Sequence, residues 1–431
     1  MKYKIGFLGM GTVAQGVWRH LSENREFMTA KLGAEYELAK VCVRDPSKSR
    51  GVSIDESLIT QNPLDVVSNP EIDIVCELMG GVEFAYKCVK TALENGKIVI
   101  TANKALLCER GAELVELAQK IDKAELFFEA SVAGGIPIVK SLGEGLVANR
   151  FSLIYGILNG TCNYILTRME RESASYESIL ADARKLGYVE ADESLDIDGI
   201  DTAHKAAVLA YLAYGKWIPL SDMVIEGIRK VRLEDMLWAK EFDYRIKLLA
   251  TIRKNLETEM VSVSVCPTLV PLSDLVANVN EVFNAVAVEG DLVGRTVYMG
   301  RGAGQNPTAS AVISDISDAF ETLKSKPIRS LLPSVDAGGI MPLSDMKSSF
   351  YIRLSVKDEL GILARVASIL AKHKISIELL EQKKHKNANE AWLILTTHKT
   401  DELSMRKACQ ELEESEFVLD KPFILRIFKN S

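Results

Sequence analysis

Apolar and polar residues alternate along the first 130 positions in short blocks that are typical of parallel strands separated by helices. Short apolar runs rich in β-branched residues are each followed by a stretch with helical spacing. The predicted strands are Tyr3–Gly9, Leu38–Val43, Ile72–Leu78, Ile98–Thr101 and Leu126–Glu129, and the clearest helical stretches are Ala85–Glu94 and Gly111–Ile121. This alternation predicts an α/β domain with a parallel sheet and crossover helices.

The pattern changes after the turn at Gly134–Pro137, so we expect the first domain to cover residues 1–135. Longer helical patterns then separate the apolar runs, which predicts an α+β domain for substrate binding and dimerisation over residues 136–300. Its predicted strands are 151–160, 258–266 and Val282–Gly290, and its helices are 175–187 and 201–214. We expect a glycine-rich loop at Gly300–Gly304, and a helix after it that returns to the first domain at about 301–325.

Proline, glycine and serine are frequent in Pro327–Pro342, which indicates a linker, placed here at residues 326–347. The remaining residues, 348–431, predict a βαββαβ unit with ferredoxin-like order. Its predicted strands are 350–356, 375–382, 389–397 and 422–428, and its helices are 361–373 and 400–414.

Composition narrows the class of protein. Of the 431 residues, 47% are apolar and 26% are charged, which is the balance of a globular protein. The net charge of −7 disfavours nucleic acid as a partner, because nucleic-acid binders usually carry a basic face. No apolar run approaches the roughly 20 residues that a membrane span needs. We therefore expect a cytoplasmic protein that acts on small molecules.

A glycine-rich loop, Gly9-Met10-Gly11-Thr12-Val13-Ala14, follows the first predicted strand and precedes a predicted helix. Its G-x-G-x-x-A spacing suits a dinucleotide: the first glycine permits a tight turn, the second lets a pyrophosphate approach, and the small third residue allows close packing. The N–H groups of Thr12 and Val13 at the helix start would bind the anion. An ordinary glycine-rich turn is the alternative, but the position after the first strand favours a Rossmann-type domain.

The end of the second predicted strand bears on the choice of cofactor. An acidic residue there binds the ribose 2′-hydroxyl of NAD, whereas an arginine suits the 2′-phosphate of NADP. Arg44 favours NADP, while the neighbouring Asp45 leaves NAD as the alternative.

The segment Leu186–Lys205 combines six acidic residues with a lysine at the start of a strongly apolar helix. Asp201 and Lys205 are spaced i, i+4 and share one helix face. Such a lysine could donate a proton to an alkoxide formed by hydride transfer, or accept one in the reverse direction. Spacing alone leaves a second interpretation open, in which an acidic cluster merely stabilises the helix N-terminus.

This segment resembles the signature of the homoserine dehydrogenase family: Leu-Gly-Tyr/Phe-x-Glu-x-Asp, then Asp-x-x-Gly-x-Asp, then a lysine four residues on. One position departs, since Glu193 stands where the family usually has proline. Further segments resemble the same family, in the family's order, so that the resemblance spans roughly residues 1–325. They are Thr101–Lys104, Phe128–Pro137, Gly156–Tyr164 and Gly302–Val312.

The resemblance implies the NAD(P)-dependent interconversion of aspartate 4-semialdehyde and homoserine, in the biosynthesis of threonine, methionine and isoleucine. It implies that Lys205 is the proton donor and acceptor and Asp201 its catalytic partner. The other roles that it implies are substrate binding by Glu190, Asp196 and Lys104, cofactor binding by Lys104 and Gly302, and a sodium ion held by Glu129 with the carbonyls of Val132, Gly134 and Ile136.

Residues Leu354–Ala364 resemble the opening of an ACT domain, a family that binds amino acids at paired interfaces. Gly361 and Ile362, at the start of a predicted helix, would face the carboxylate of an effector such as threonine. A module that serves only dimerisation is the alternative. We expect a homodimer or homotetramer, and the form of this family without an aspartate-kinase segment.

Two other functions compete with this one. Another amino-acid or hydroxyacid dehydrogenase could use the same nucleotide fold, and a catalytically silent amino-acid sensor could use it as a scaffold. The intact pair of Asp201 and Lys205 argues against the sensor.

Overall fold

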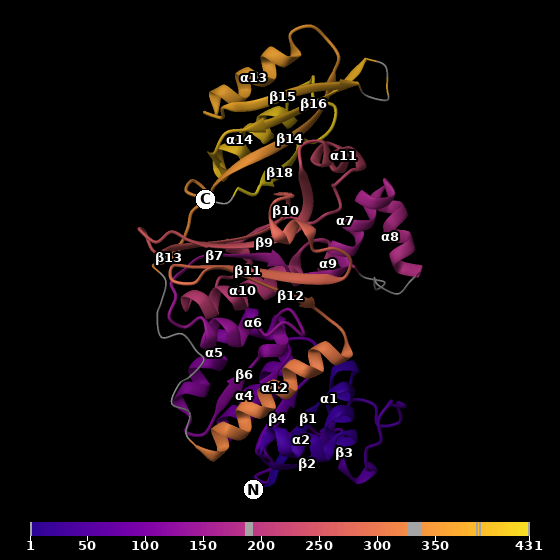
Figure 1. Cartoon of the computed structure of the whole chain (residues 1–431), viewed down its shortest axis with the longest axis vertical. Coiled ribbons are helices and arrows are strands. Elements are labelled where there is room, and N and C mark those ends of the chain that lie inside the picture. Colours follow the sequence, from indigo (N-terminus) through magenta and orange to yellow (C-terminus); the bar gives the residue numbers. More distant parts are fainter. Residues whose placement is uncertain (1, 186–192, 326–337, 385–386, 388, 430–431) are drawn as a thin grey trace. The chain divides into compact units, whose positions relative to one another are not determined.

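The computed structural model describes residues 2–185, 193–325, 338–384, 387 and 389–429, and the chain forms two compact units (Figure 1). Unit 1 comprises Met1–Ile154, Asp201–Asp222 and Val282–Ala337. Unit 2 comprises Tyr155–Ile200, Met223–Glu281 and Gly338–Ser431. In the part of the chain that the structure describes, no helix is long and apolar enough to cross a membrane.

A six-stranded parallel sheet in the order β3-β2-β1-β4-β5-β6 forms the centre of unit 1. Its strands are β1 (Lys2–Leu8), β2 (Glu35–Cys42), β3 (Ile59–Thr60), β4 (Ile74–Glu77), β5 (Ile98–Thr101) and β6 (Glu125–Phe127). The five predicted strands are confirmed, whereas the two-residue β3 is too short to leave a pattern. The order reverses between β1 and β4, which is where doubly wound sheets bind their ligands.

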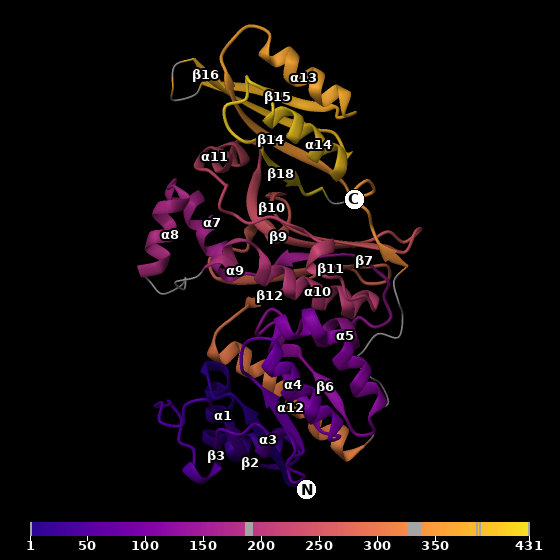
Figure 2. The same cartoon turned by 180° about the vertical axis from the view of Figure 1, so that it is seen from behind.

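Helices cover both faces of this sheet (Figures 1 and 2). α1 (Thr12–Glu23) and α12 (Gln305–Lys324) lie on one face, and α4 (Glu83–Glu94) and α5 (Lys104–Lys120) lie on the other. The ring of Phe320 in α12 lies 4.7 Å from that of Tyr3 in β1, inside the core of the sheet. α12 therefore contributes to the hydrophobic core on this face of the sheet.

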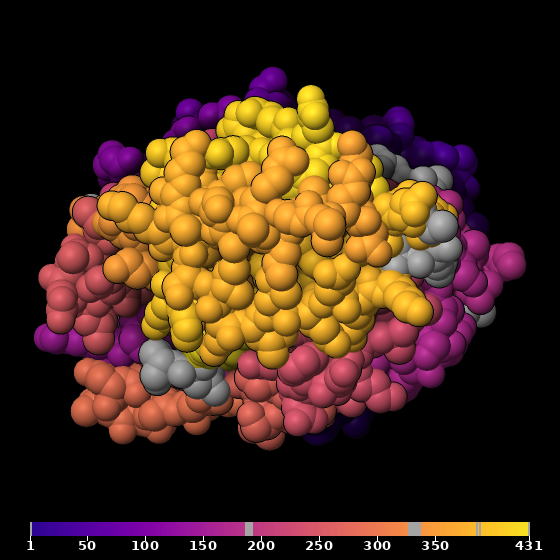
Figure 3. All heavy atoms as spheres, turned by 90° about the horizontal axis from the view of Figure 1, so that it is seen from above, coloured from indigo at the N-terminus to yellow at the C-terminus, as the bar shows by residue number. Residues whose placement is uncertain are grey.

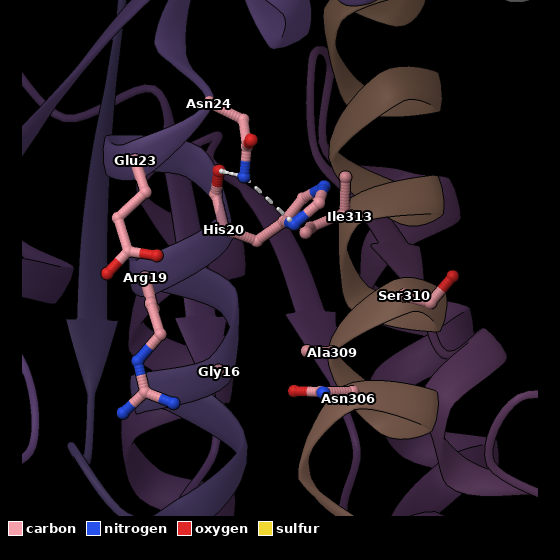
Figure 4. Close-up of a pocket in the computed structure, with 9 residues that line it drawn as sticks. All are labelled: Gly16, Arg19, His20, Glu23, Asn24, Asn306, Ala309, Ser310 and Ile313. Carbon is pink, nitrogen blue, oxygen red and sulfur yellow. Dashed lines mark hydrogen bonds between the residues drawn. The ribbon is translucent and has the colours of Figure 1, made fainter.

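α1 and α12 pack closely where Gly16 faces Ala309 (Figure 4). A Cβ atom at Gly16 would lie only 2.7 Å from Cγ of Gln305. Beyond this contact the two helices border a groove of about 470 Å³. Its lining, which includes Arg19 and His20, contains no residue that the sequence predicts for the active site.

Unit 1 also contains the hairpin of β11 (Phe283–Gly290) and β12 (Gly294–Arg301). The prediction of a loop from Gly300 is wrong at its start, because Gly300 and Arg301 pair with β11 and the loop begins at Gly302. β12, whose residues are exposed or half-buried, has no clear apolar alternation, so its pairing could not be predicted from the sequence. The other helices of unit 1 are α2 (Arg25–Leu32), α3 (Leu64–Val67), α6 (Ile138–Lys140) and most of α10 (Ile200–Tyr214), and β7 (Phe151–Ile157) crosses into unit 2.

Two long antiparallel strands, β9 (Tyr244–Lys254) and β10 (Met260–Pro271), form the base of unit 2. The other edge of β10 pairs in parallel with three short strands: β13 (Gly339–Ile340), β8 (Val224–Ile225) and β18 (Phe423–Ile427). β9 was not predicted, because its run of leucine, alanine and lysine lacks the alternation of a half-buried strand. The helices of this part are α7 (Gly160–Glu172), α8 (Tyr176–Lys185), α9 (Ser194–Ile197) and α11 (Leu233–Glu241).

The C-terminal part of unit 2 confirms the predicted βαββαβ order. Its elements are β14 (Lys347–Lys357), α13 (Ile362–Lys372), β15 (Ile377–Lys384), β16 (Glu390–Thr397), α14 (Glu402–Glu413) and β18. The strands pair in the order β18-β14-β16-β15, and Figure 3 shows one face of this part in orange and yellow. β18 pairs with β14 on one side and with β10 on the other, which the sequence did not indicate.

Candidate active site

A cavity of about 340 Å³ in unit 1 brings together four segments that are distant in the sequence. They are the start of α1, the start of α5, the turn at residues 130–134 and the loop before α12. Lys205 of α10 also reaches this cavity. The lining residues are Thr12, Val13, Leu78, Met79, Ala102, Lys104, Ala130, Ser131, Ala133, Gly134, Lys205, Gly302, Ala303, Gly304, Gln305 and Thr308.

The glycine-rich loop Gly9–Ala14, the nucleotide loop, has a backbone that can accept a phosphate. Gly9 has a φ of +92°, and a Cβ there would lie 2.9 Å from the carbonyl oxygen of Leu78. A Cβ on Gly11 would meet nothing within 4 Å, so the backbone before α1 is open to a ligand. No acidic residue lies in the first turn of α1, so its partial positive charge is available to an anion. Gly9, Gly11, Thr12 and Val13 therefore fit a dinucleotide.

Local capping places Lys104 at the start of α5. The side chain of Asn103 accepts a hydrogen bond of 3.1 Å from the N–H of Leu106 and donates one of 2.7 Å to the carbonyl of Gly81. This cap ends the connection after β5 and begins α5 at Lys104. The ammonium group of Lys104 then lies 2.9 Å from Oδ1 of Asp201.

Asp201 is held between two lysines. Its Oδ2 accepts a hydrogen bond of 2.7 Å from Nζ of Lys205, and its Oδ1 pairs with Lys104. The side chain of Asp201 is 9% exposed and that of Lys205 is 11% exposed. Burial alone would oppose ionisation, but the charges of Lys205 and Lys104 outweigh it and hold the pKa of Asp201 well below its usual value.

The turn at residues 132–136 lies directly against the loop before α12. Gly135 donates a backbone hydrogen bond of 3.0 Å to the carbonyl of Arg301. A Cβ at Gly134 would lie 2.6 Å from the carbonyl oxygen of Gly302, and a Cβ at Gly302 would clash with the side chain of Asn284. Two of the quoted family motifs thus form one wall of the cavity through backbone contact.

Glu129 is buried beside this turn, and its carboxylate accepts hydrogen bonds from the N–H groups of Val139 (3.1 Å) and Lys140 (2.8 Å). Burial raises the pKa of Glu129 to about 7. The carbonyl of Ile136 accepts the N–H of Ile138 at 2.8 Å. Two of the four groups predicted to bind sodium therefore already have partners in the local backbone.

The loop after β2 distinguishes Arg44 from Asp45. Arg44 is exposed, as a side chain that binds a phosphate would be. Oδ1 of Asp45 accepts hydrogen bonds from both the N–H (2.9 Å) and the hydroxyl (2.6 Å) of Ser47. These hydrogen bonds, the hydroxyl of Ser47 first, lower the pKa of Asp45. The acidic side chain is thus turned toward its own loop.

Asp196 belongs to unit 2, where it lies in α9. Its Oδ1 accepts a hydrogen bond of 2.7 Å from the side-chain amide of Asn159, and its carbonyl accepts one of 3.2 Å from the thiol of Cys162. Asn159 also caps α7 through the N–H of Cys162. Glu190, the other predicted substrate acid, lies outside the described residues.

The chain matches known proteins over nearly its full length. Residues 137–317 match the family described as homoserine dehydrogenase, and residues 9–129 match its NAD-binding domain. A homoserine dehydrogenase of Neisseria gonorrhoeae is 40% identical over 98% of this chain and 97% of its own length. A crystal structure of a homoserine dehydrogenase from Thiobacillus denitrificans superposes with a TM-score of 0.90 at 39% identity, covering 99% of this chain and 98% of that one.

The chain belongs to the homoserine dehydrogenase family. It is an NAD(P)-dependent oxidoreductase that acts on a CH–OH group. A hyperthermophilic archaeal homoserine dehydrogenase, solved in complex with NADPH, covers 76% of this chain and all of its own, with a TM-score of 0.64 and 28% identity. The match to an NAD-binding domain and this NADPH complex support a nicotinamide cofactor, and the open backbone at Gly11 leaves room for one.

Residues 350–417 match the ACT domain family, which confirms the second resemblance. Gly361 caps α13 with a φ of +86°, a conformation that favours glycine, and a Cβ there would meet nothing within 4 Å. Ile362 is buried in the core of this domain. The open backbone is at Gly361, whereas the side chain of Ile362 serves packing.

Two residues were not predicted: Gln305, which lines the cavity, and Glu77, which accepts a hydrogen bond from the N–H of the lining residue Met79. Gln305, at the start of α12, donates a hydrogen bond of 3.0 Å to the carbonyl of Thr12. It also accepts a hydrogen bond of 3.0 Å from Arg19, so it joins α12 to the nucleotide loop. Glu77, at the carboxyl end of β4, is buried, and its carboxylate accepts a hydrogen bond of 2.6 Å from the hydroxyl of Thr101. An acidic residue ending an apolar strand was a usable signal for Glu77, whereas Gln305 was indicated only by the family resemblance of Gly302–Val312.

Proposed function

We propose that this chain interconverts L-aspartate 4-semialdehyde and L-homoserine, with NADP as its preferred cofactor. The observation that carries the proposal is the carboxylate of Asp201 between the ammonium groups of Lys205 and Lys104, with both lysines at the cavity that the nucleotide loop borders. Such a cluster suits the handling of a single proton at an alcohol or alkoxide oxygen.

Lys205 is the proposed proton donor and acceptor. As an ammonium group it donates a proton to the oxygen that becomes the hydroxyl of homoserine, and as an amine it takes that proton back in the reverse direction. Asp201 fixes the position of Nζ through the 2.7 Å hydrogen bond. Lys104, held at the N-terminus of α5, adds a second positive charge for the substrate oxygen and the cofactor.

The cofactor is proposed to lie along Gly9, Gly11, Thr12 and Val13, and to contact Gly302, which also lines the cavity. When bound, its nicotinamide accepts or supplies the hydride. The N-terminus of α1 binds the pyrophosphate through backbone N–H groups. The preference for NADP rests on the exposed Arg44 and on Asp45 being occupied by Ser47, and the archaeal relative with NADPH supports it.

The substrate's ammonium group is proposed to bind Asp196 and Glu190. A carboxylate is the natural partner of an ammonium ion, and the amide of Asn159 fixes the orientation of Asp196. The sodium ion at Glu129, Val132, Gly134 and Ile136 stays a prediction from the resemblance, and no step of this function depends on it.

The direct test is an assay of homoserine oxidation by the purified chain, with NADP and NAD side by side. We expect activity with homoserine, none with malate or saccharopine, and a higher kcat/KM with NADP than with NAD. Activity with another hydroxyacid but not with homoserine would overturn the substrate. Equal or better use of NAD would overturn only the cofactor preference.

We also propose that the ACT domain provides feedback regulation by an amino acid, with threonine as the first candidate. Gly361 offers open backbone at the start of α13, where an effector carboxylate could bind. Threonine titrated into the full chain should lower activity, and Gly361→Asp, which places a negative charge at that point, should remove the response. No inhibition of the unmodified chain by threonine would refute this choice of effector.

The domain limits inferred from the sequence belong to the same proposal: 1–135 with about 301–325 for the cofactor, 136–300 for the substrate and dimerisation, 326–347 as linker and 348–431 for regulation. We further propose a homodimer or homotetramer located in the cytoplasm, and a place in threonine, methionine and isoleucine biosynthesis. Light scattering of the purified chain would decide the oligomer size.

A further inference from the structure

One guanidinium group holds both ends of the short helix α9, which contains Asp196. Nε of Arg229 lies 2.6 Å from Oδ1 of Asp198, and Nη2 lies 3.2 Å from Oδ2, so the two side chains meet as a fork. Nη1 of the same residue lies 3.5 Å from Oε1 of Glu193. Glu193 precedes α9 and Asp198 follows it, so Arg229 fixes the helix at its two ends.

Glu193 is the position at which this chain departs from the usual family proline. Its side chain is 9% exposed, and Oε1 also accepts a hydrogen bond of 2.7 Å from Arg184 of α8. The hydrogen bond from Arg184, with further help from Arg229, lowers the pKa of Glu193. A proline would stiffen the backbone at this point, whereas in this chain two arginines hold the side chain that replaces it.

The backbone next to Arg229 supports α9 as well. The N–H of Ile228 donates a hydrogen bond of 3.0 Å to the carbonyl of Ile197. A Cβ at Gly227 would clash with that carbonyl and lie 2.6 Å from Cα of Asp198. The segment 226–229 therefore touches the last turn of α9 without a gap, and any shift of this segment would move α9.

The other end of this segment is held by the ACT domain. Nη1 and Nη2 of Arg426 in β18 each lie 2.8 Å from a carboxylate oxygen of Glu226, which is a bidentate fork. Arg426 is 6% exposed and also binds Glu402 of α14 at 2.5 Å. The N–H of Glu226 donates a hydrogen bond of 2.8 Å to the carbonyl of Val265, which attaches the segment 226–229 to β10.

We propose that Arg229 is a positioning residue that holds α9 so that Asp196 presents its carboxylate to the substrate, and that Arg426 of the ACT domain holds the segment of Arg229 through Glu226. This inference rests on the proposed role of Asp196 in binding the substrate's ammonium group. It makes the ACT domain part of the support of the substrate site even when no effector is bound.

The test compares Arg229→Met with Asp196→Asn in steady-state kinetics of the full chain. Arg229→Met should raise the KM for homoserine about tenfold, because a small displacement of a binding group costs affinity. The KM for NADP and the melting temperature should stay close to those of the unmodified chain. Arg229→Lys, which keeps the charge but loses the fork, should give an intermediate KM.

Arg232→Met is the matched control. Arg232 lies in the same connection before α11, is similarly exposed (44% against 42% for Arg229), and pairs with Asp420 of the C-terminal part at 2.5 Å. Its ion pair does not involve Glu193 or Asp198. We expect its KM for homoserine to remain within about twofold of the unmodified chain, within the small effect of an exposed ion pair.

The double variant Asp196→Asn/Arg229→Met separates positioning from general destabilisation. If Arg229 acts through Asp196, the double variant should have the KM of Asp196→Asn alone. A normal KM in Arg229→Met beside a raised KM in Asp196→Asn would overturn the inference alone. A normal KM in Asp196→Asn would overturn the proposed role of Asp196 and the inference with it. Parallel losses for homoserine, NADP and melting temperature would also overturn it.

The link to the ACT domain is tested by Glu226→Gln. This variant is preferred to Arg426→Met, which would also leave the buried Glu402 without this cation and endanger folding. Glu226→Gln keeps the shape of the side chain and should raise the KM for homoserine about threefold, in line with the loss of one charge-assisted pair. An unchanged KM, beside a raised one in Arg229→Met, would overturn the part assigned to the ACT domain.

Discussion

Asp196 and Asp201 stand close together in the sequence, yet their carboxylates accept from different kinds of group. The carboxylate of Asp201 accepts from the two ammonium groups of Lys205 and Lys104, at 2.7 and 2.9 Å. Oδ1 of Asp196 accepts from the neutral amide of Asn159, a contact that fixes orientation without adding a positive charge. The difference teaches that partners outside the acidic run distinguish two aspartates that look alike in the sequence: Lys205 lies one turn along the same helix as Asp201, whereas Lys104 and Asn159 come from distant segments.

Removing Lys205 from the cluster that it forms with Asp201 and Lys104 should have the largest effect on activity. Lys205→Met should lower kcat about 1,000-fold, because general acid–base catalysis by a positioned group contributes on this order. NADPH should still bind, with a dissociation constant within about twofold by fluorescence titration. Lys120→Met, at an exposed lysine of α5, serves as the control. Near-normal turnover in Lys205→Met would refute its assignment.

The charge of Asp201 should appear in stability. Its pKa is lowered in the folded protein, so its contribution is fully present above the unfolded pKa of about 4 and is lost as the pH falls through the folded value. Asp201→Asn should therefore lower the free energy of unfolding at pH 7 by about 3 kcal/mol, since two lysines lose their buried partner. Denaturant unfolding at several pH values should show this difference shrinking below about pH 4. A difference that does not change with pH would contradict the lowered pKa.

Asp196→Asn should affect binding rather than turnover. We expect the KM for homoserine to rise about 30-fold, with little change in the KM for NADP, because an ion pair with the substrate is replaced by a neutral contact. Steady-state kinetics with each substrate varied in turn would measure this. A loss of kcat at constant KM would instead assign Asp196 to the chemical step and remove the contrast with Asp201.

A third aspartate, Asp45, can be compared with these two, and it bears on the choice between NADP and NAD. Its carboxylate is occupied by Ser47, so Arg44 should decide the preference. Arg44→Ala should reduce the ratio of kcat/KM for NADP over NAD about tenfold, the value of one charge-assisted contact to a phosphate. Lys31→Ala, at an exposed lysine of α2, should leave the ratio unchanged. A constant ratio in Arg44→Ala would show that other residues read the 2′-phosphate.

Features with local signals could be predicted from the sequence. The nucleotide loop follows a strand and starts a helix, and the βαββαβ unit has clear periodicity, so both were found within a few residues of their observed limits. The pair of Asp201 and Lys205 shares one helix, and its spacing alone predicted the contact.

Features that depend on distant partners could not be predicted in this way. Spacing says nothing about Lys104 meeting Asp201, and only the family resemblance pointed to Lys104. No sequence pattern marks Arg229, and nothing near Glu226 indicates that it pairs with Arg426. β9 was missed because it is buried without alternation, and β12 was missed because its residues are exposed or half-buried.

The pairing of β10 with β18 has a consequence for how the chain folds during its synthesis. Thr268 and Leu269 of β10 pair with Arg426 and Ile427, near the end of the chain. Until β18 has been synthesised, this stretch of β10 presents unpaired backbone groups that can bind another strand. Pairings of such long sequence separation form slowly, because the intervening loop must close first. A chain truncated before β18 should therefore aggregate more readily than the full chain.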